Sequence, residues 1–125
     1  MAGGGSVAIL AFASDIEVLS SELHTGAAGD GGNGAEGQPG QAGGTGGLGA
    51  TPGCAGGNGG RGGQGGAGAG GTGGVSVGIL WQGDLAPVNL ETVFDLGRFG
   101  DGGLSGDLYE NDGLVGRSEA LLRVD

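Results

Sequence analysis

The residues of this chain whose types suit catalysis are few and lie close together. His24 is the only histidine, and Asp15, Ser20 and Ser21 are polar residues near it in the sequence. A Ser-His-acid arrangement needs a nucleophile, a base and an orienting group that converge across the fold. Here all of them lie in one short segment, so we expect His24 to be a hydrogen-bonded histidine at the end of a strand. We predict no catalytic residue and no enzymatic activity.

Two glycine motifs match the dinucleotide-binding pattern G-x-G-x-x-G, namely GDGGNG at 29–34 and GNGAEG at 32–37. This pattern binds a pyrophosphate when a strand precedes it and a helix follows it. No helix is expected after either motif, and in a glycine-rich tract such matches arise from composition alone. We therefore predict no cofactor site.

Acidic residues gather in the segments expected to be loops. They are Asp30, Asp101, Asp107, Glu110 and Asp112. Carboxylates in loops are ligands that calcium prefers, but neither the EF-hand spacing nor the glycine-rich nonapeptide repeat occurs. The predicted role is solvated charge that keeps a glycine-rich surface soluble, and no metal site is assigned.

The charge balance limits the classes of binding partner that we expect. The chain has 14 Asp and Glu against four Lys and Arg, a net charge of -10, which disfavours nucleic acid and anionic membrane surfaces. No apolar run is long enough to span a bilayer, and no basic segment marks a signal peptide. The lone Cys54 cannot form an intrachain disulfide. It is a candidate for an interchain disulfide, or for a small residue packed beside glycine.

Glycine accounts for 38 of the 125 residues and leaves little apolar material for a conventional core. It recurs at every third position in two tracts separated by Ala50-Thr51-Pro52. These in-phase glycines are Gly34, Gly37, Gly40, Gly43, Gly46, Gly49, Gly53, Gly56, Gly59, Gly62, Gly65, Gly68, Gly71 and Gly74. A period of three residues matches a polyproline-II-type helix, here polyglycine II, and leaves one edge without side chains.

The two tracts have similar lengths, which predicts an antiparallel hairpin over 26–74 rather than a flexible linker or a collagen triple helix. Such helices make no internal hydrogen bonds, so the in-phase glycines are the expected contact surface for neighbouring helices. The step at 32–34 breaks the phase and predicts a kink or a shift of register. A shorter run that begins at Gly97 is expected to lie beside the hairpin.

The columns next to the in-phase glycines differ in the second tract. The residues that directly follow them include Gly57, Gly60, Gly63 and Gly66, while the third column contains polar side chains. We therefore expect two nearly bare edges that pack against neighbours and one edge in water.

A strand-like phrase recurs outside the glycine tracts. The segments 6–10, 76–80 and 118–122 share a serine, a variable residue, a small residue and two aliphatic residues, and 26–32 resembles 97–103. Short apolar segments bounded by Gly, Asp, Asn and Pro are typical of strands. Their repetition after about 70 residues predicts stacked coils of a β-solenoid.

We predict one domain over 1–125 that is all-β with polyglycine-II helices. In it, short β-solenoid-like strands carry an inserted antiparallel hairpin of glycine-rich extended helices. The strand coils are 6–25, 75–96 and 118–125, the long hairpin is 26–74, and a shorter glycine-rich loop is 97–117. Residues 16–24 also fit one or two helical turns with Asp15 as N-cap, which is the alternative to strand.

The phrases SVAILAF and SVGILW, the glycine hairpin between them and the later SEALLRV resemble a known group of proteins. They are similar to the C-terminal part of large, exported, glycine-rich right-handed β-helix proteins of myxobacteria and related bacteria. This resemblance implies an extracellular or cell-surface setting. In glycine periodicity the tracts also resemble the snow flea antifreeze protein, a bundle of polyproline-II-type helices, from which the strand segments and the scarcity of regularly spaced Thr differ.

Open solenoid ends expose unpaired strand edges, and two legs alone leave backbone groups unbonded. We therefore expect a structural protein whose copies assemble head to tail into an extracellular or cell-surface fibril, with the chain itself as partner. The alternative is a binding module, either for ice through a flat helix face or for a surface receptor through the tip at 50–52. A pectate-lyase-like enzyme ranks last, because four arginines build no basic cluster.

Overall fold

The computed structural model describes residues 1–107 and 110–125. These residues form seven β-strands and no helix, so the protein is all-β. The strands are β1 (Ser6–Phe12), β2 (Glu17–Leu19), β3 (Glu22–His24), β4 (Ser76–Gln82), β5 (Val88–Leu90), β6 (Val93–Asp95) and β7 (Ser118–Arg123). The helical alternative for 16–24 is wrong. The segment forms β2 and β3, and between them Ser20 has a φ of 45°, which no right-handed helix contains.

All strand pairs are parallel, and they form three small sheets. The first sheet has the order β1-β4-β7, while β2 pairs with β5 and β3 pairs with β6. Ser76 is aligned with Ser6 on one side and with Ser118 on the other, which confirms the alignment of the strand phrases. Parallel pairing requires a long crossover between partners, and residues 26–74 lie within the crossover from β3 to β4.

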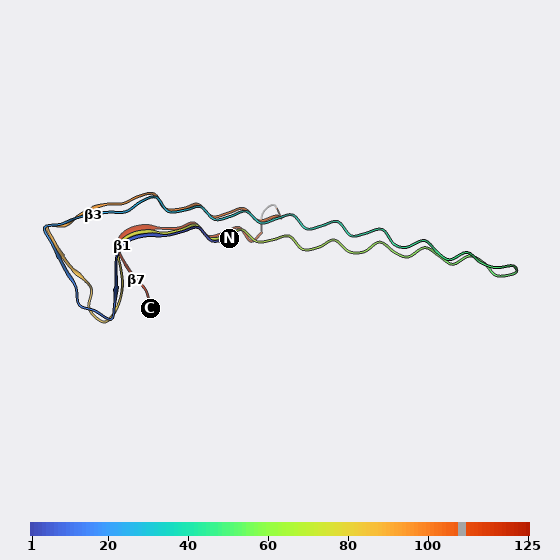
Figure 1. Cartoon of the computed structure of the whole chain (residues 1–125), viewed down its shortest axis with the longest axis horizontal. Helices are drawn as coiled ribbons and strands as arrows, with labels where there is room; N and C mark the ends of the chain where they lie inside the picture. The colour runs from blue at the N-terminus through green and yellow to red at the C-terminus, as the bar shows by residue number, and fades with distance from the viewer. Residues whose placement is uncertain (108–109) are drawn as a thin grey trace.

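The strands lie at one end of an elongated molecule (Figure 1). We call residues 6–25, 75–96 and 118–125 the head. The chain turns at its corners through residues other than glycine with positive φ, among them Ala13 at 45°, Ser20 at 45° and Glu91 at 50°. Ser20 and Glu91 follow aligned strands, and the Ser20 hydroxyl donates to the Glu91 carboxylate at 2.9 Å. Side-chain contacts therefore join equivalent corners of successive repeats.

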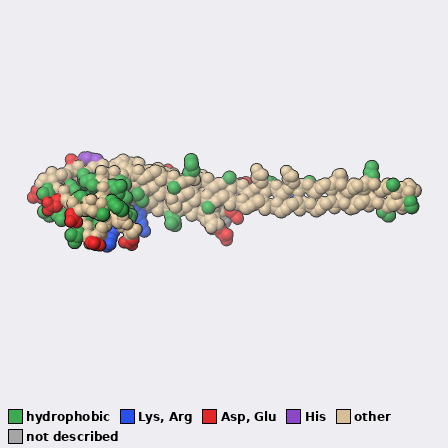
Figure 2. Space-filling view, turned by 60° about the horizontal axis from the view of Figure 1, so that its bottom comes forward, with side chains coloured by type: hydrophobic (Ala, Val, Ile, Leu, Met, Phe, Trp, Pro, Cys, Tyr) green, Lys and Arg blue, Asp and Glu red, His purple; other side chains and the backbone are tan. Residues whose placement is uncertain are grey.

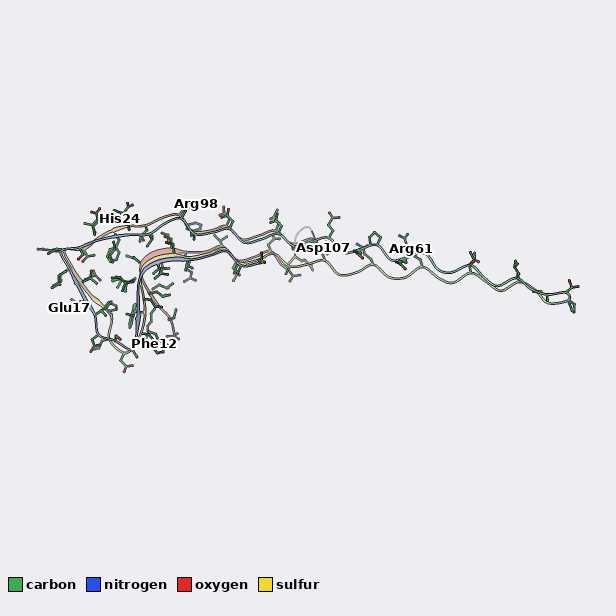
Figure 3. All side chains as sticks on the ribbon, in the orientation of Figure 1. Phe12, Glu17, His24, Arg61, Arg98 and Asp107 are labelled. Carbon is green, nitrogen blue, oxygen red and sulfur yellow. The ribbon has the colours of Figure 1, made fainter. Side chains whose placement is uncertain are left out.

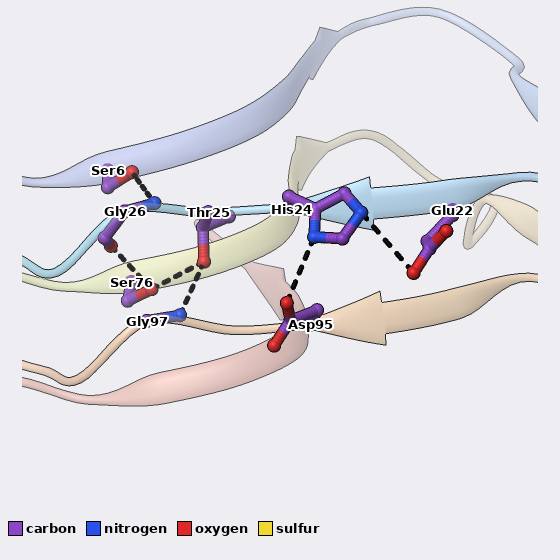
Figure 4. Close-up of polar contacts among 8 residues, drawn as sticks. All are labelled: Ser6, Glu22, His24, Thr25, Gly26, Ser76, Asp95 and Gly97. Atoms are coloured by element: carbon purple, nitrogen blue, oxygen red, sulfur yellow. Dashed lines mark hydrogen bonds and ion pairs between the residues drawn. The ribbon is translucent and has the colours of Figure 1, made fainter.

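The buried side chains of the head gather around β4, the middle strand of the three-stranded sheet. Val77 and Ile79 are fully buried. Ser76 is also buried, and its hydroxyl shares a hydrogen bond with Thr25 Oγ1 at 2.6 Å and donates to the Gly26 carbonyl at 3.2 Å (Figure 4). The polar group at the start of β4 is therefore satisfied by the segment that leads into the hairpin.

Residues 26–74 form the predicted antiparallel hairpin, whose two legs extend far beyond the head (Figure 1). Amides of the returning leg donate to carbonyls of the outgoing leg once every three residues. The series runs from Gly74 to Gly29 at 2.9 Å as far as Gly56 to Gly47 at 2.9 Å. This spacing is constant along the hairpin, so the legs are joined by backbone bonds rather than by packed side chains.

The predicted shift of register at 32–34 is wrong, because two different columns of the outgoing leg are involved. The column of Gly29 and Gly32 supplies the carbonyls that accept from the returning leg, and it continues past the step without interruption. The glycines that face the returning leg belong to another column, which contains Gly31 and Gly34. The apparent break is the point where Ala35 follows Gly32 in the first column, while glycine continues at every position of the second column.

Three further segments pack along the part of the hairpin nearest the head: residues 1–5, 97–106 and 111–117. Backbone bonds join each of them to its neighbours, for example Gly29 N–H to the Gly4 carbonyl at 2.8 Å and Gly100 N–H to the Gly74 carbonyl at 3.0 Å. The run that begins at Gly97 therefore lies beside the hairpin, as predicted. Farther out the two legs extend alone (Figure 1).

Candidate assembly surfaces

The in-phase glycines of the outgoing leg are required by the hairpin itself. A Cβ added at Gly34, Gly37, Gly40, Gly43 or Gly46 would collide with a carbonyl oxygen of the returning leg, and one added at Gly49 would collide with Cys54. No rotation of a side chain relieves such a clash, because the obstacle is backbone. The in-phase glycines of the outgoing leg, which the sequence predicted to be packing positions, therefore contact the returning leg of the same chain.

The in-phase glycines of the returning leg fall into two groups. At Gly71 and Gly74, near the head, an added Cβ would collide with the backbone of residues 1–5. Farther out, the nearest atoms to a Cβ at Gly68 or Gly62 lie at 3.2 Å and 3.6 Å. Gly56, Gly59 and Gly65 fall between these values, and Gly53 lies against Ala50 at the tip. Close approach therefore requires glycine most strongly where a third segment is present.

The distal hairpin also carries glycines that touch nothing within the chain. A Cβ added at any of them would meet no atom within 4 Å: Gly44, Gly47, Gly57, Gly60, Gly63 and Gly66. Four of them form the bare column expected from the sequence, while Gly44 and Gly47 add a bare stretch on the outgoing leg. The described fold gives no steric reason for glycine at these positions.

The third column of the returning leg changes where segment 97–106 ends. At Gly70 and Gly73 an added Cβ would collide with that segment. Beyond its end, the same column carries side chains that reach the outgoing leg: Asn58 Oδ1 accepts the Gly46 N–H at 2.8 Å, and Arg61 Nε donates to the Gly40 carbonyl at 3.0 Å (Figure 3). Asn58 and Arg61 thus bond to the outgoing leg on the side where segment 97–106 bonds to it nearer the head.

One edge of the head is apolar and unpaired. In the described part of the chain no strand lies beside the second edge of β1, and its sequence, SVAILAF, contains no charge. Leu10 and Phe12 on this strand are 70% and 69% exposed, and apolar side chains cover much of the head in Figure 2. An uncharged, open edge of this kind is a template for pairing with another strand.

The opposite end of the same sheet is formed by β7 and carries charge. Glu119 lies 3.9 Å from Arg117 in an exposed ion pair, and Arg123 lies 3.7 Å from Asp125. The Arg123 guanidinium also lies over the Trp81 ring, 5.3 Å from its centroid. Charged side chains on an edge strand oppose pairing with another chain, so the two ends of this sheet differ in chemistry. The difference in charge between these two strands could be read from the sequence, but only the strand order shows that they are the two edges of one sheet.

The residues considered for nucleophilic chemistry are not brought together. Ser20 donates to Glu91, and the Ser21 hydroxyl donates to the Leu19 carbonyl at 2.7 Å. His24 is the last residue of β3, where Nδ1 contacts Asp95 Oδ2 at 3.0 Å and Nε2 contacts Glu22 Oε1 at 3.3 Å (Figure 4). The hydrogen bond to Asp95, followed by the charge of Glu22, raises the pKa of His24 above 6.5. The predicted hydrogen-bonded histidine at a strand end is confirmed.

Several acidic residues connect successive repeats. Arg98 binds Asp30 at 3.2 Å and Asp101 at 3.1 Å, and the Asp101 amide donates to Asp30 Oδ1 at 2.9 Å. Farther along, Asp112 Oδ1 accepts the Ser105 amide at 2.7 Å. Asp107 and Glu110 lie in the same loop, where the Glu110 amide donates to the Asp107 carbonyl at 3.5 Å. Within residues 1–107 and 110–125, no group of three or more His, Cys, Asp and Glu side chains is placed to hold a metal ion.

No protein-family profile, curated protein or solved structure matches this chain. In the described residues, no helix has the length and apolar character needed to cross a membrane.

Proposed function

We propose that this chain is a structural protein whose copies assemble head to tail into an extracellular or cell-surface fibril. In this proposal the paired repeats of the head are coils of a β-solenoid, and the legs of the hairpin are polyglycine-II helices. The partner is a second copy of the chain, with no role for nucleic acid or membrane insertion.

The observation that carries the proposal is the open, uncharged edge of β1. Unpaired amides and carbonyls along such an edge favour addition of another strand, and burial of Leu10 and Phe12 adds a hydrophobic contribution of about 1.5 to 3 kcal/mol each when complete. The aligned serines of β1, β4 and β7 indicate that the strand phrase stacks on copies of itself in one register. A second molecule offers the same phrase.

The hairpin supports a sheath around such a fibril. Its legs share one backbone bond per three residues, which is the pattern expected of adjacent polyglycine-II helices. In the described part of the chain the amides of Gly44 and Gly47 have no hydrogen-bond acceptor, and a Cβ added at either glycine would meet no atom within 4 Å. Hairpins of successive copies would bond to one another there. Cys54 is exposed and is our candidate for an interchain disulfide.

Electron microscopy of the purified chain across a range of concentration and salt tests this proposal. We expect fibrils that lengthen with concentration, and the Leu10→Asp variant should form none, because it places a charge in the apolar edge. The matched control is Leu48→Asp, which adds the same charge at the fully exposed hairpin tip, far from the head. Compact, monodisperse particles of the unmodified chain under every condition would rule the proposal out.

The second candidate is a binding module for ice or for a surface receptor. The observation that favours it is the distal hairpin, which projects from the head and carries Arg61 as its one charged residue between 37 and 75 (Figure 3). A long, regular, nearly uncharged surface is suited to a flat ligand. A measurement of thermal hysteresis at millimolar concentration tests the ice-binding form, and its absence removes that form.

A further inference from the structure

The three sheets of the head do not end at the same level. The first sheet has three strands, whereas the sheets of β2-β5 and β3-β6 have two each. In the described chain, β5 and β6 therefore have free outer edges, while the corresponding edge of β4 is covered by β7. This inequality determines how a second copy can dock, and the inference that follows rests on the proposed head-to-tail assembly.

While β7 remains in place, the three strands β1, β2 and β3 of a second copy cannot all pair with the head at once. If its β1 paired with β7, its β2 and β3 would lie one strand spacing, about 4.8 Å, beyond pairing distance from β5 and β6. The free edges of β5 and β6 would stay unpaired inside the junction. Val88, Leu90 and Val93, which are 43%, 59% and 59% exposed, would also stay uncovered.

Removal of β7 allows all three strands of a second copy to pair. The outer edge of β4 would receive β1, and at the same level β2 would meet β5 and β3 would meet β6. One six-residue strand is then replaced by strands of seven, three and three residues. The exchange loses the β7 ladder and the backbone bonds that Gly73 and Ser76 donate to Leu114 and Arg117, and it forms three ladders.

The first strand of a second copy suits the edge that β7 occupies. β1 and β7 both pair with β4 in the register that aligns their serines with Ser76. At the position aligned with Val77, β7 has Glu119 and β1 has Val7. β1 therefore offers an apolar residue beside a fully buried neighbour, where β7 offers a carboxylate.

We propose that β7 is a displaceable cap on the growing end of the fibril. While it is docked, β7 covers the outer edge of β4 with a charged strand that opposes further pairing. When it leaves, β4, β5 and β6 present one continuous edge to β1, β2 and β3 of a second copy. The rate of growth is then set by the fraction of ends in which β7 is displaced.

The proposal is tested by changing how firmly β7 is held in the full-length chain. Leu121→Asp places a charge on the partly buried middle of β7, whereas Glu119→Val makes β7 more like β1. Growth from sheared fibril seeds, followed by light scattering and microscopy, should be about tenfold faster for Leu121→Asp, since a tenfold larger displaced fraction gives a tenfold larger rate. It should be slower than in the unmodified chain for Glu119→Val.

A synthetic peptide of residues 113–125 provides a second measurement. Added in trans, it should occupy the exposed edge of β4 and slow the growth of the Leu121→Asp chain. The control for the added charge is again Leu48→Asp, which should grow at the unmodified rate.

Changes of growth rate opposite to those expected would contradict the proposal that β7 is a cap. If β1 instead pairs with β7, Leu121→Asp should block growth and Glu119→Val should accelerate it. The second variant decides the question if Leu121→Asp does not fold. Failure of the unmodified chain to form any fibril contradicts the proposed function itself, whereas fibrils with the wrong order of rates contradict only the cap.

Discussion

The head and the hairpin of this molecule are stabilised in different ways. The head has buried side chains, with Val77 and Ile79 fully enclosed, and all of its strand pairs are parallel. The distal hairpin has no such core; its legs are held by one backbone bond for every three residues. The head therefore depends on which side chains are present, and the hairpin depends on where side chains are absent.

The head and the distal hairpin also differ in charge. Arg61 is the one charged residue between 37 and 75, so all 14 acidic residues lie outside the distal hairpin (Figure 2). The head exposes acidic side chains, whereas the hairpin exposes the polar amides and carbonyls of its backbone. Adding or removing a side-chain group, or protonating one, should therefore affect either the head or the hairpin and leave the other region unchanged.

Truncation of a core side chain should have the largest effect, and it should act on the head. We expect Ile79→Ala to lower the free energy of unfolding by about 2 to 4 kcal/mol, because it removes buried methylene groups and leaves a cavity beside β4. Denaturant unfolding followed by Trp81 fluorescence measures the change. The same type of truncation at the fully exposed tip, Leu48→Ala, should leave the midpoint unchanged. Equal effects of the two variants would contradict the division between head and hairpin.

Addition of a single methyl group should have the next largest effect, and it should act on the hairpin. We expect Gly40→Ala to break the distal bonds, because its Cβ would collide with the Gly62 carbonyl. Hydrogen exchange of the Gly59 and Gly65 amides should become at least about tenfold faster, as expected for local opening, while the unfolding midpoint of the head stays the same.

The matched control for this second prediction is Gly60→Ala, in the bare column of the returning leg. Its Cβ would meet no atom within 4 Å, so the monomer should keep its exchange rates. Loss of backbone freedom in the unfolded chain makes a small gain in stability the expected result there. Faster exchange in Gly60→Ala, or unchanged exchange in Gly40→Ala, would show that the columns do not differ.

Much of this division could be predicted from the sequence. The in-phase glycines predicted the hairpin, and the repeated phrase predicted that Ser6, Ser76 and Ser118 align, because both signals are periodic and local. The corners could not be predicted: Ala13 and Ser20 adopt positive φ, a conformation usually taken by glycine. Their amides donate to carbonyls of the next repeat, a contact between residues distant in sequence.

The surfaces of the hairpin could not be predicted from the sequence, because they depend on where distant segments lie. The change from Gly70 and Gly73 to Arg61 and Asn58 within one column could be read from the sequence, but its reason could not. Segment 97–106 contacts Gly70 and Gly73, and beyond its end the side chains of Arg61 and Asn58 bond to the outgoing leg instead. The predicted shift of register at 32–34 was wrong for the same reason, since the role of each column depends on which segment it faces.

The smallest predicted effect is a dependence on pH that belongs to the head alone. Because Asp95 and Glu22 raise the pKa of His24 in the folded chain, the charged imidazole stabilises the pair of β3 and β6. This contribution is fully present below the unfolded pKa of about 6.5 and is lost as pH rises through the higher folded value. The His24 ring resonance should therefore titrate above 6.5, and Asp95→Asn should move the midpoint down. Exchange in the hairpin, corrected for its intrinsic pH dependence, should not change over this range. A midpoint at or below 6.5 would show that the contacts of His24 do not form in solution.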